Sequence, residues 1–287
     1  MWYAERLREM VHLKGFLREL HNHTVSVEDT NYRVEYALSV GNEELPLTSL
    51  LENSIEMRFT GEKSCVHCGR KVKKLFQNGY CYPCVTTLAE CDLCIVKPHE
   101  CHYDQGTCRD NTFGDSHCMI PHYVYLADSS AVKVGLTRKG RQLKRWTDQG
   151  ATSAVLLAQT PTRKLAGQLE MHIAQHLPDK TDWRKMLRDT GDRDADLLDV
   201  RQQVISTLDS GYTGFILADS GPIHRFEYPR VSGFEPILKS LSLDKEPTVS
   251  GRLYAIKGQY LMFEHGVLNI KKHAGFHVEV SVSAGVS

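Results

Sequence analysis

All nine cysteines of the chain lie between Cys65 and Cys118. A chain of 287 residues buries enough apolar surface to fold without disulfides, so this concentration favours metal binding over cross-linking. Aliphatic residues are sparse in the same stretch, whereas Gly, Pro, His and Tyr are common, as expected where a metal ion replaces a hydrophobic core. We therefore expect residues 65–121 to form a cysteine-rich metal module.

Two Cys-x2-Cys pairs in the first half of this module have the spacing of a zinc ribbon. Cys65 and Cys68 are separated from Cys81 and Cys84 by twelve residues. Two tight turns can then present four thiolates to a tetrahedral ion at about 2.3 Å. Gly69 directly after the first pair suits such a turn, in which backbone amides approach the sulfurs. The spacing predicts a structural zinc site.

The second half of the module contains more candidate ligands than one ion needs. The remaining cysteines are Cys91, Cys94, Cys101, Cys108 and Cys118. Cys91 and Cys94 form the pair with the clearest spacing, and His102 is an alternative to one of the other sulfurs. We expect a second structural zinc ion here. An iron–sulfur cluster is the alternative, since three scattered cysteines after a Cys-x2-Cys pair also suit such a cluster.

The composition of the whole chain is that of an ordinary globular protein. Hydrophobic residues make up 41% and charged residues 24%, which excludes wholesale disorder. Lys plus Arg equals Asp plus Glu at 35 each, which excludes a uniformly basic nucleic-acid coat but permits a local basic patch. The first residues include no apolar signal segment, and no stretch approaches the roughly 18 apolar residues of a membrane span. We expect a cytoplasmic protein without membrane contact, and the sequence does not indicate its oligomeric state.

The order of apolar and turn residues divides the chain into five segments and predicts an α+β fold. We expect residues 1–64 to begin with a helix from Tyr3 to Leu20 and to end in strands that pack with the C-terminal sheet. The metal module (65–121) is followed at 122–190 by a strand–strand–helix–strand–helix unit. Residues 191–250 are predicted to be a helical connector, and residues 251–287 a β-rich terminal domain.

Basic residues gather in two places, and both predict contact with phosphate. The first is the loop of the zinc ribbon, with Lys71, Lys73 and Lys74. The second contains six cations in thirteen residues without an intervening carboxylate: Lys133, Arg138, Lys139, Arg141, Lys144 and Arg145. A helix face that is only solvated usually mixes both signs of charge. We therefore predict binding of structured RNA or DNA, with Trp146 as a stacking partner for a base.

The strings HYVYLA (122–127) and KVGL (133–136), a basic helix and a Leu-Glu pair in a later helix resemble the GIY-YIG endonuclease superfamily. The likeness covers residues 122–177 and includes the branch in which Lys-x-Gly replaces Tyr-Ile-Gly. Over residues 65–187 the chain is also similar to an uncharacterised prokaryotic family, a domain of unknown function, through CDLCIVKP, GTCR, KVGLTR and DKTDWRKML. Together these resemblances imply a cysteine-rich zinc-ribbon module followed by a GIY-YIG-like β-β-α-β-α domain.

The superfamily resemblance also implies a site around one divalent ion that hydrolyses a phosphodiester. The catalytic positions carried over to this chain are Tyr123, Tyr125, Lys133, Arg141, Arg145 and Glu170. Glu170 would hold Mg²⁺ or Mn²⁺, and Arg145, or Arg141 in its place, would clamp the phosphate. Lys133 replaces the second tyrosine of the motif. A lysine at this position lacks a phenolate and would instead contact phosphate.

Three functions follow from these observations. The first is a zinc-containing nucleic-acid-binding protein with a metal-dependent endonuclease site. The second is a non-catalytic RNA-binding or ribosome-associated factor, in which Lys133 makes the former nuclease cleft a phosphate-binding pocket. The third is an iron–sulfur protein of redox or RNA-modification function, which the spacing of the later cysteines permits.

Overall fold

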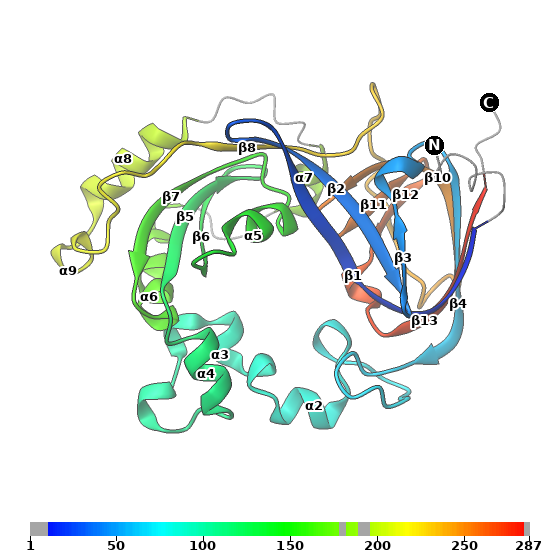
Figure 1. The fold of residues 1–287 in the computed structure, drawn as a ribbon, viewed down its shortest axis with the longest axis horizontal. Helices are drawn as coiled ribbons and strands as arrows, with labels where there is room; N and C mark the ends of the chain where they lie inside the picture. The colour runs from blue at the N-terminus through cyan, green and yellow to red at the C-terminus, as the bar shows by residue number, and fades with distance from the viewer. Residues whose placement is uncertain (1–10, 178–181, 189–195, 284–287) are drawn as a thin grey trace. The chain divides into compact units, whose positions relative to one another are not determined.

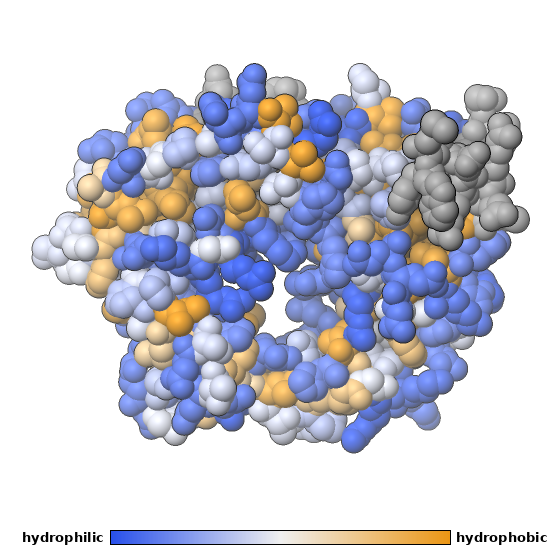
Figure 2. All heavy atoms as spheres, in the orientation of Figure 1, coloured by the Kyte–Doolittle hydropathy of each residue, from blue (hydrophilic) through white to orange (hydrophobic). Residues whose placement is uncertain are grey.

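The computed structural model describes residues 11–177, 182–188 and 196–283. They divide into unit 1 (residues 1–23, 34–85 and 228–287) and unit 2 (residues 24–33 and 86–227). Both units contain strands and helices, so the mixed helix and strand content predicted from the sequence is confirmed. Hydrophilic side chains cover most of the face shown in Figure 2. Within the described part of the chain, none of the helices is long and apolar enough to cross a membrane.

Unit 1 is a mainly antiparallel sheet in the order β2-β1-β13-β4-β10-β11-β12-β9, with β3 beside β2 (Figure 1). Its strands are β1 (Val11–Glu28), β2 (Asn31–Val40), β3 (Glu43–Pro46), β4 (Ser54–Lys63), β9 (Ser240–Leu241), β10 (Thr248–Lys257), β11 (Tyr260–Phe263), β12 (Gly266–Asn269) and β13 (Phe276–Ser283). The turn between β10 and β11 contacts both β1 and β2. The Gln259 side chain bonds to the backbone N–H and C=O of Leu20, and the Tyr36 hydroxyl accepts from the N–H of Gly258.

The strands predicted after residue 251 and at the end of segment 1–64 are confirmed, but the predicted N-terminal helix is wrong over residues 11–20. These residues belong to β1, and residues 3–10 of the predicted helix lie outside the described part of the chain. Leu13, Gly15 and Leu17 are buried alternately and pair with β13, with Leu13 opposite Val280. A spacing of four residues fits one helical turn and also two strand repeats. The segment forms a strand because β13, at the far end of the sequence, pairs with it.

Unit 2 begins with short helical turns and continues as a small sheet flanked by helices. Its helical elements are η3 (Ala89–Cys91), α3 (Leu93–Val96), η4 (Pro98–Glu100), η5 (Tyr103–Gln105), α4 (Asn111–His117), α5 (Gln142–Asp148), α6 (Arg163–Ile173), α7 (Trp183–Arg188), α8 (Leu197–Thr207) and α9 (Ser210–Thr213). The strands are β5 (His122–Asp128), β6 (Val132–Arg138), β7 (Ser153–Thr160) and β8 (His224–Glu227), in the order β6-β5-β7-β8. The order strand–strand–helix–strand–helix predicted from residue 122 is confirmed over β5, β6, α5, β7 and α6.

Helices flank both faces of this sheet, and one face contains the core of unit 2 (Figure 1). On that face, Val124 and Leu136 pack with Leu169 and Ile173 of α6 and with Val204 of α8. Directly opposite residues of antiparallel strands project to the same side. Tyr125 faces Gly135, and Ala127 faces Lys133, so these residues lie on the side away from the α6 core. The sheet therefore separates Tyr125 and Lys133 of the predicted site from the apolar core, whereas Glu170 lies on α6.

Two segments differ from the predicted division of the chain. Residues 65–85 belong to unit 1 and residues 86–121 to unit 2, and α2 (Tyr82–Thr87) contains the point of division. The predicted helical connector contains α8 and α9, but it also includes β8 and β9. β8 pairs with β7 and with residues 31–33 of β2, which belong to unit 2. The rings of Tyr32 and Trp146 lie against its residues His224 and Phe226.

Candidate functional site

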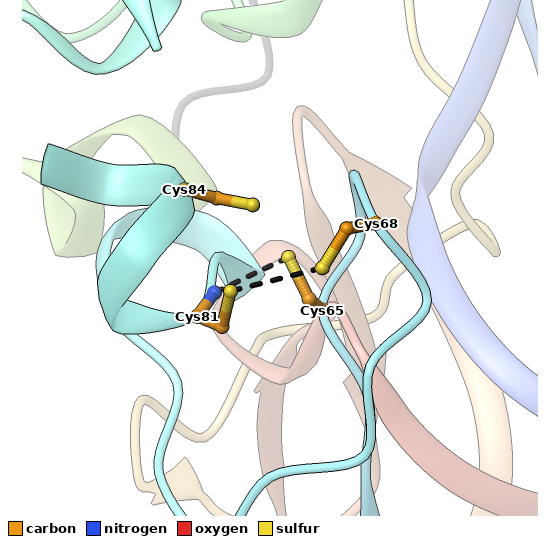
Figure 3. Close-up of side chains that lie close together, drawn as sticks. All are labelled: Cys65, Cys68, Cys81 and Cys84. Atoms are coloured by element: carbon orange, nitrogen blue, oxygen red, sulfur yellow. Dashed lines mark hydrogen bonds between the residues drawn. The ribbon is translucent and has the colours of Figure 1, made fainter. Parts of the chain in front are cut away.

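Four cysteines of unit 1 converge on one point. Cys65 and Cys68 lie in the turn after β4, and Cys81 and Cys84 lie at the start of α2. Their sulfurs are all within 4.8 Å of one another (Figure 3). The Sγ atoms of Cys68 and Cys81 are 3.8 Å apart, which equals the edge of about 3.8 Å expected for a tetrahedron of 2.3 Å zinc–sulfur bonds. This cluster can bind a metal ion such as zinc.

Backbone hydrogen bonds fix the turn that carries the first two sulfurs. The N–H of Cys65 donates to the carbonyl of Arg70, and the N–H of Gly69 donates back to the carbonyl of Cys65. Gly69 has a φ of 72°, a region that residues with a Cβ rarely adopt. The Ser64 hydroxyl closes the turn by donating to the Gly69 carbonyl over 2.7 Å. The glycine after the first pair therefore has the role that the sequence indicates.

The electrostatics of the cluster favour the deprotonated form of one sulfur. Burial alone would raise the pKa of Cys65, but hydrogen bonds from the backbone N–H groups of Cys68, Cys81 and His67 lower it well below its usual range. The N–H of Cys81 lies 3.2 Å from this sulfur. Burial and hydrogen bonds to the other sulfurs instead raise the pKa of Cys84. Four thiols this close cannot all ionise without a cation, which is the property of a metal-binding thiolate cluster.

The remaining cysteines lie in unit 2, where four of them line one small cavity. Its sulfur-bearing residues are Cys94 on α3, Cys101 after η4, Cys108 before α4 and Cys118 after α4. Ile95, Phe113 and Gly114 form apolar parts of its wall. Cys91 is buried in η3 and does not line the cavity. Of the pair Cys91 and Cys94, only Cys94 therefore lines the cavity.

Asp92 and His102 line the same cavity, and protein groups already bond to both. The Asp92 carboxylate accepts from the N–H of Cys94 at 3.3 Å and pairs with Nε of Arg109 at 2.7 Å. His102 lies 3.5 Å from Asp92 and hydrogen-bonds to the hydroxyl of Thr107. The ligand atoms of Asp92, Cys94 and His102 are within 4.8 Å of one another, and this group includes no second sulfur. These contacts hold the loops around the cavity in place.

A half-buried cation, Arg163, lies beside the sulfurs of the cavity. Burial raises the pKa of Cys94 to about 12, and the negative charges of Asp92, Cys101 and Cys118 act in the same direction. Burial also raises the pKa of Cys118, but the charge of Arg163 opposes this shift. Arg163 opens α6, donates through Nη2 to the carbonyl of Ile95 at 2.6 Å, and keeps Nε buried without a partner among the described residues.

A third constellation brings together four of the predicted catalytic residues. Tyr125 is fully buried on β5, and its hydroxyl donates to Gln149 at 2.9 Å. Lys133 is 5% exposed, and burial together with the charge of Arg145 lowers its pKa to about 8, although Glu170 acts to raise it. The pKa of Tyr125 is raised by burial and lowered by Arg145, so all four groups lie within electrostatic range. They combine two cations, a phenol and a carboxylate.

The other two predicted catalytic residues lie outside this group. Tyr123 lies two residues from Tyr125 on β5 and faces Lys139, whose Nζ is 5.8 Å from the ring centroid. Arg141 is exposed directly before α5 and lowers the pKa of Arg138, which burial also lowers. Neither contributes to the pKa shifts of Tyr125 or Lys133.

Most of the residues predicted to bind nucleic acid are exposed, but Lys133 is buried. Lys139, Arg141, Lys144 and Arg145 are exposed and Arg138 is half-buried, but Lys144 pairs with Asp148 at 3.1 Å. In unit 1, Lys73 is exposed, Lys74 lies over the ring of Phe76, and Lys71 pairs with Glu62 at 2.7 Å. Trp146 is wrong as a stacking partner for a base. Its side chain is fully buried against Tyr125 and Phe226, because it anchors α5 to the sheet.

Sequence reasoning missed three residues that shape these sites. Arg163 and Arg109 have no neighbours in the sequence that distinguish them from surface cations, and only the fold places them beside Cys118 and Asp92. Gln149, the partner of the Tyr125 hydroxyl, likewise comes from the end of a different element. No local pattern could have identified them.

Comparison with known proteins identifies one match. The family model "Protein of unknown function (DUF2797)" matches residues 52–278. No curated protein and no solved structure matches the chain. The matched residues include both groups of cysteines and the sheet that carries Tyr125 and Lys133. The chain belongs to this family of proteins of unknown function.

Proposed function

We propose that the protein binds structured RNA or DNA and cleaves a phosphodiester in a GIY-YIG-like site of unit 2. The observation that supports this proposal is that Arg145 and Glu170 both act electrostatically on Tyr125 and on Lys133, which lie on the paired strands β5 and β6. The same four positions carry the resemblance to the endonuclease superfamily. The exposed cations at residues 139–145 adjoin this group in the sequence and provide binding for the phosphate backbone.

Each group has a separate task in this proposal. Glu170 would hold Mg²⁺ or Mn²⁺, which supplies charge stabilisation and an activated water when bound. Arg145 is exposed and contacts the phosphate, whereas Lys133 lies deeper and neutralises charge at the floor of the site. The phenol of Tyr125 is fully buried and donates to Gln149, so its task is to position the neighbouring groups of the site from within the sheet. The Cys65 cluster binds zinc and keeps the basic loop of unit 1 folded.

A second function is favoured by the burial of Lys133. A lysine replaces the phenolate base of the motif, and its ammonium group suits a phosphate that is bound without being cleaved. In that case the protein is a non-catalytic RNA-binding factor. Both functions require nucleic-acid binding by the same cations.

A cleavage assay with Mg²⁺ or Mn²⁺ on structured RNA, tRNA and DNA flaps separates the two functions. We expect wild-type protein to cleave at least one substrate, and Glu170→Gln to lose cleavage while it retains binding. Glu227→Gln, an exposed carboxylate on β8 of the same unit, is the matched control and should cleave normally. Binding without cleavage by the wild-type protein supports the second function, and absence of binding by wild type refutes both.

A further inference from the structure

The cysteines of unit 2 surround a space, whereas those of unit 1 meet at a point. In unit 1, four sulfurs are mutually within 4.8 Å. Among the described residues of unit 2, no group of three or more sulfurs lies within that distance. The unit 2 group with ligand atoms within 4.8 Å contains Cys94 as its one sulfur. The two sets of cysteines therefore differ in the spacing between their sulfurs as well as in their position in the fold.

This difference selects the kind of group that each set can bind. A single tetrahedral ion holds its four thiolates at a spacing of about 3.8 Å, which is the spacing in unit 1. An iron–sulfur cluster has several iron and sulfide atoms between its thiolates, so the cysteines must stand farther apart around a cavity. Cys94, Cys101, Cys108 and Cys118 come from four different loops and helices and line one cavity together.

The wall of the cavity also suits a cluster. Such clusters are bound by thiolates, and their properties depend on hydrogen bonds to sulfur and on exclusion of water. Ile95, Phe113 and Ala89 provide an apolar wall. Arg163 places a positive charge beside Cys118 and retains a buried Nε donor without a partner among the described residues. This guanidinium offsets part of the negative charge of four thiolates.

We propose that the cavity of unit 2 binds an iron–sulfur cluster through the thiolates of Cys94, Cys101, Cys108 and Cys118. Cys91 is not a ligand in this assignment, and Asp92 and His102 support the loops through their bonds to Arg109 and Thr107. The zinc ion belongs to the separate cluster of unit 1. This assignment replaces the second zinc ion that the sequence analysis predicts.

The cluster would also hold α6 in place. The N–H of Arg163 donates to the carbonyl of Cys118 at 2.8 Å, and the Arg163 side chain bonds to Ile95 beside Cys94. A Cβ added to Gly167 would lie 2.6 Å from the backbone of His99, so α6 packs directly against η4. Because α6 also carries Glu170, cleavage should depend on the cluster. This one consequence rests on the proposed function.

The test is the metal content of the full chain, purified without oxygen and incubated with ferrous iron, sulfide and a reductant. We expect a brown protein that contains iron and acid-labile sulfide in equal amounts together with one zinc ion, and an electron paramagnetic resonance signal after reduction. A colourless protein with two zinc ions and no iron would overturn the proposal. These measurements use the wild-type chain, so they do not depend on the folding of any variant.

Variants then test the ligands. Cys101→Ser and Cys108→Ser should lose iron and keep zinc, Cys68→Ser should lose zinc and keep iron, and the control Cys91→Ala should keep both. Loss of iron in Cys91→Ala with full iron in Cys108→Ser would refute the ligand set. An iron-containing protein that cleaves no nucleic acid supports the cluster and refutes the nuclease. Cleavage by a colourless protein with two zinc ions does the reverse.

Discussion

Replacing Lys133 by methionine should make the protein more stable at neutral pH, because the ammonium group is buried at an energetic cost. Burial lowers the pKa of Lys133 from 10.5 to about 8. The unfolded chain therefore binds a proton between these two pH values that the folded chain does not bind. The difference of about 2.5 pKa units corresponds to roughly 3 kcal/mol. Methionine keeps the length of the side chain and removes the charge.

The sign of this effect depends on pH in a way that can be measured. Below about pH 8 the full penalty is present, so Lys133→Met should exceed wild type by up to about 3 kcal/mol in the free energy of unfolding. As the pH rises from 8 towards 10.5, wild-type Lys133 loses its proton in the folded state and the difference should disappear. Urea unfolding of both proteins at a series of pH values gives this difference directly. Titration of the cysteines affects both chains equally and cancels.

Lys139→Met is the matched control, because Lys139 is an exposed lysine of the same unit, directly after β6. It should change the stability by less than about 0.5 kcal/mol at any pH. If Lys133→Met is no more stable than wild type at pH 7, or if its advantage does not shrink with rising pH, the burial of an unfavourable charge is refuted. A gain in stability accompanied by weaker nucleic-acid binding would show that the buried lysine is retained for function.

Three further outcomes follow from the structure. Cys68→Ser, or removal of zinc by a chelator, should unfold the loop of the first cluster, since structural zinc contributes on the order of 10 kcal/mol to folding. An intact zinc content in the variant would contradict the ligand assignment. Trp146→Ala should reduce the free energy of unfolding by about 3–5 kcal/mol in urea titrations; a loss of binding without a loss of stability would contradict its role as a buried anchor. Arg141→Ala combined with Lys144→Ala should lower the salt dependence of nucleic-acid binding by up to about two phosphate contacts, whereas Lys245→Ala should leave it unchanged. An unaltered slope in the double variant would mean that this patch does not contact nucleic acid.

Sequence patterns among neighbouring residues were sufficient to predict the structure where one interaction dominates it locally. The two Cys-x2-Cys pairs at residues 65–84 predict the four-sulfur cluster, because a metal ion constrains only the residues that bind it. Alternating apolar residues predict β10 to β13, and the order from β5 to α6 follows from turn residues and helical spacing. In each case the sequence within one element contains the information.

The tertiary structure decided what depends on residues far apart in the chain. Leu13 and Leu17 belong to a strand because β13 supplies the hydrogen bonds, and Trp146 is buried because β8 returns to cover it. Cys118 lines the unit 2 cavity together with Cys94, because the end of α4 is hydrogen-bonded to Arg163 at the start of α6, whereas Cys91 does not line it. The spacing of cysteines in the sequence shows which ligands are available. Only the packing between elements determines which of these ligands lie close together, because side chains from separate elements converge after the backbone between them is placed.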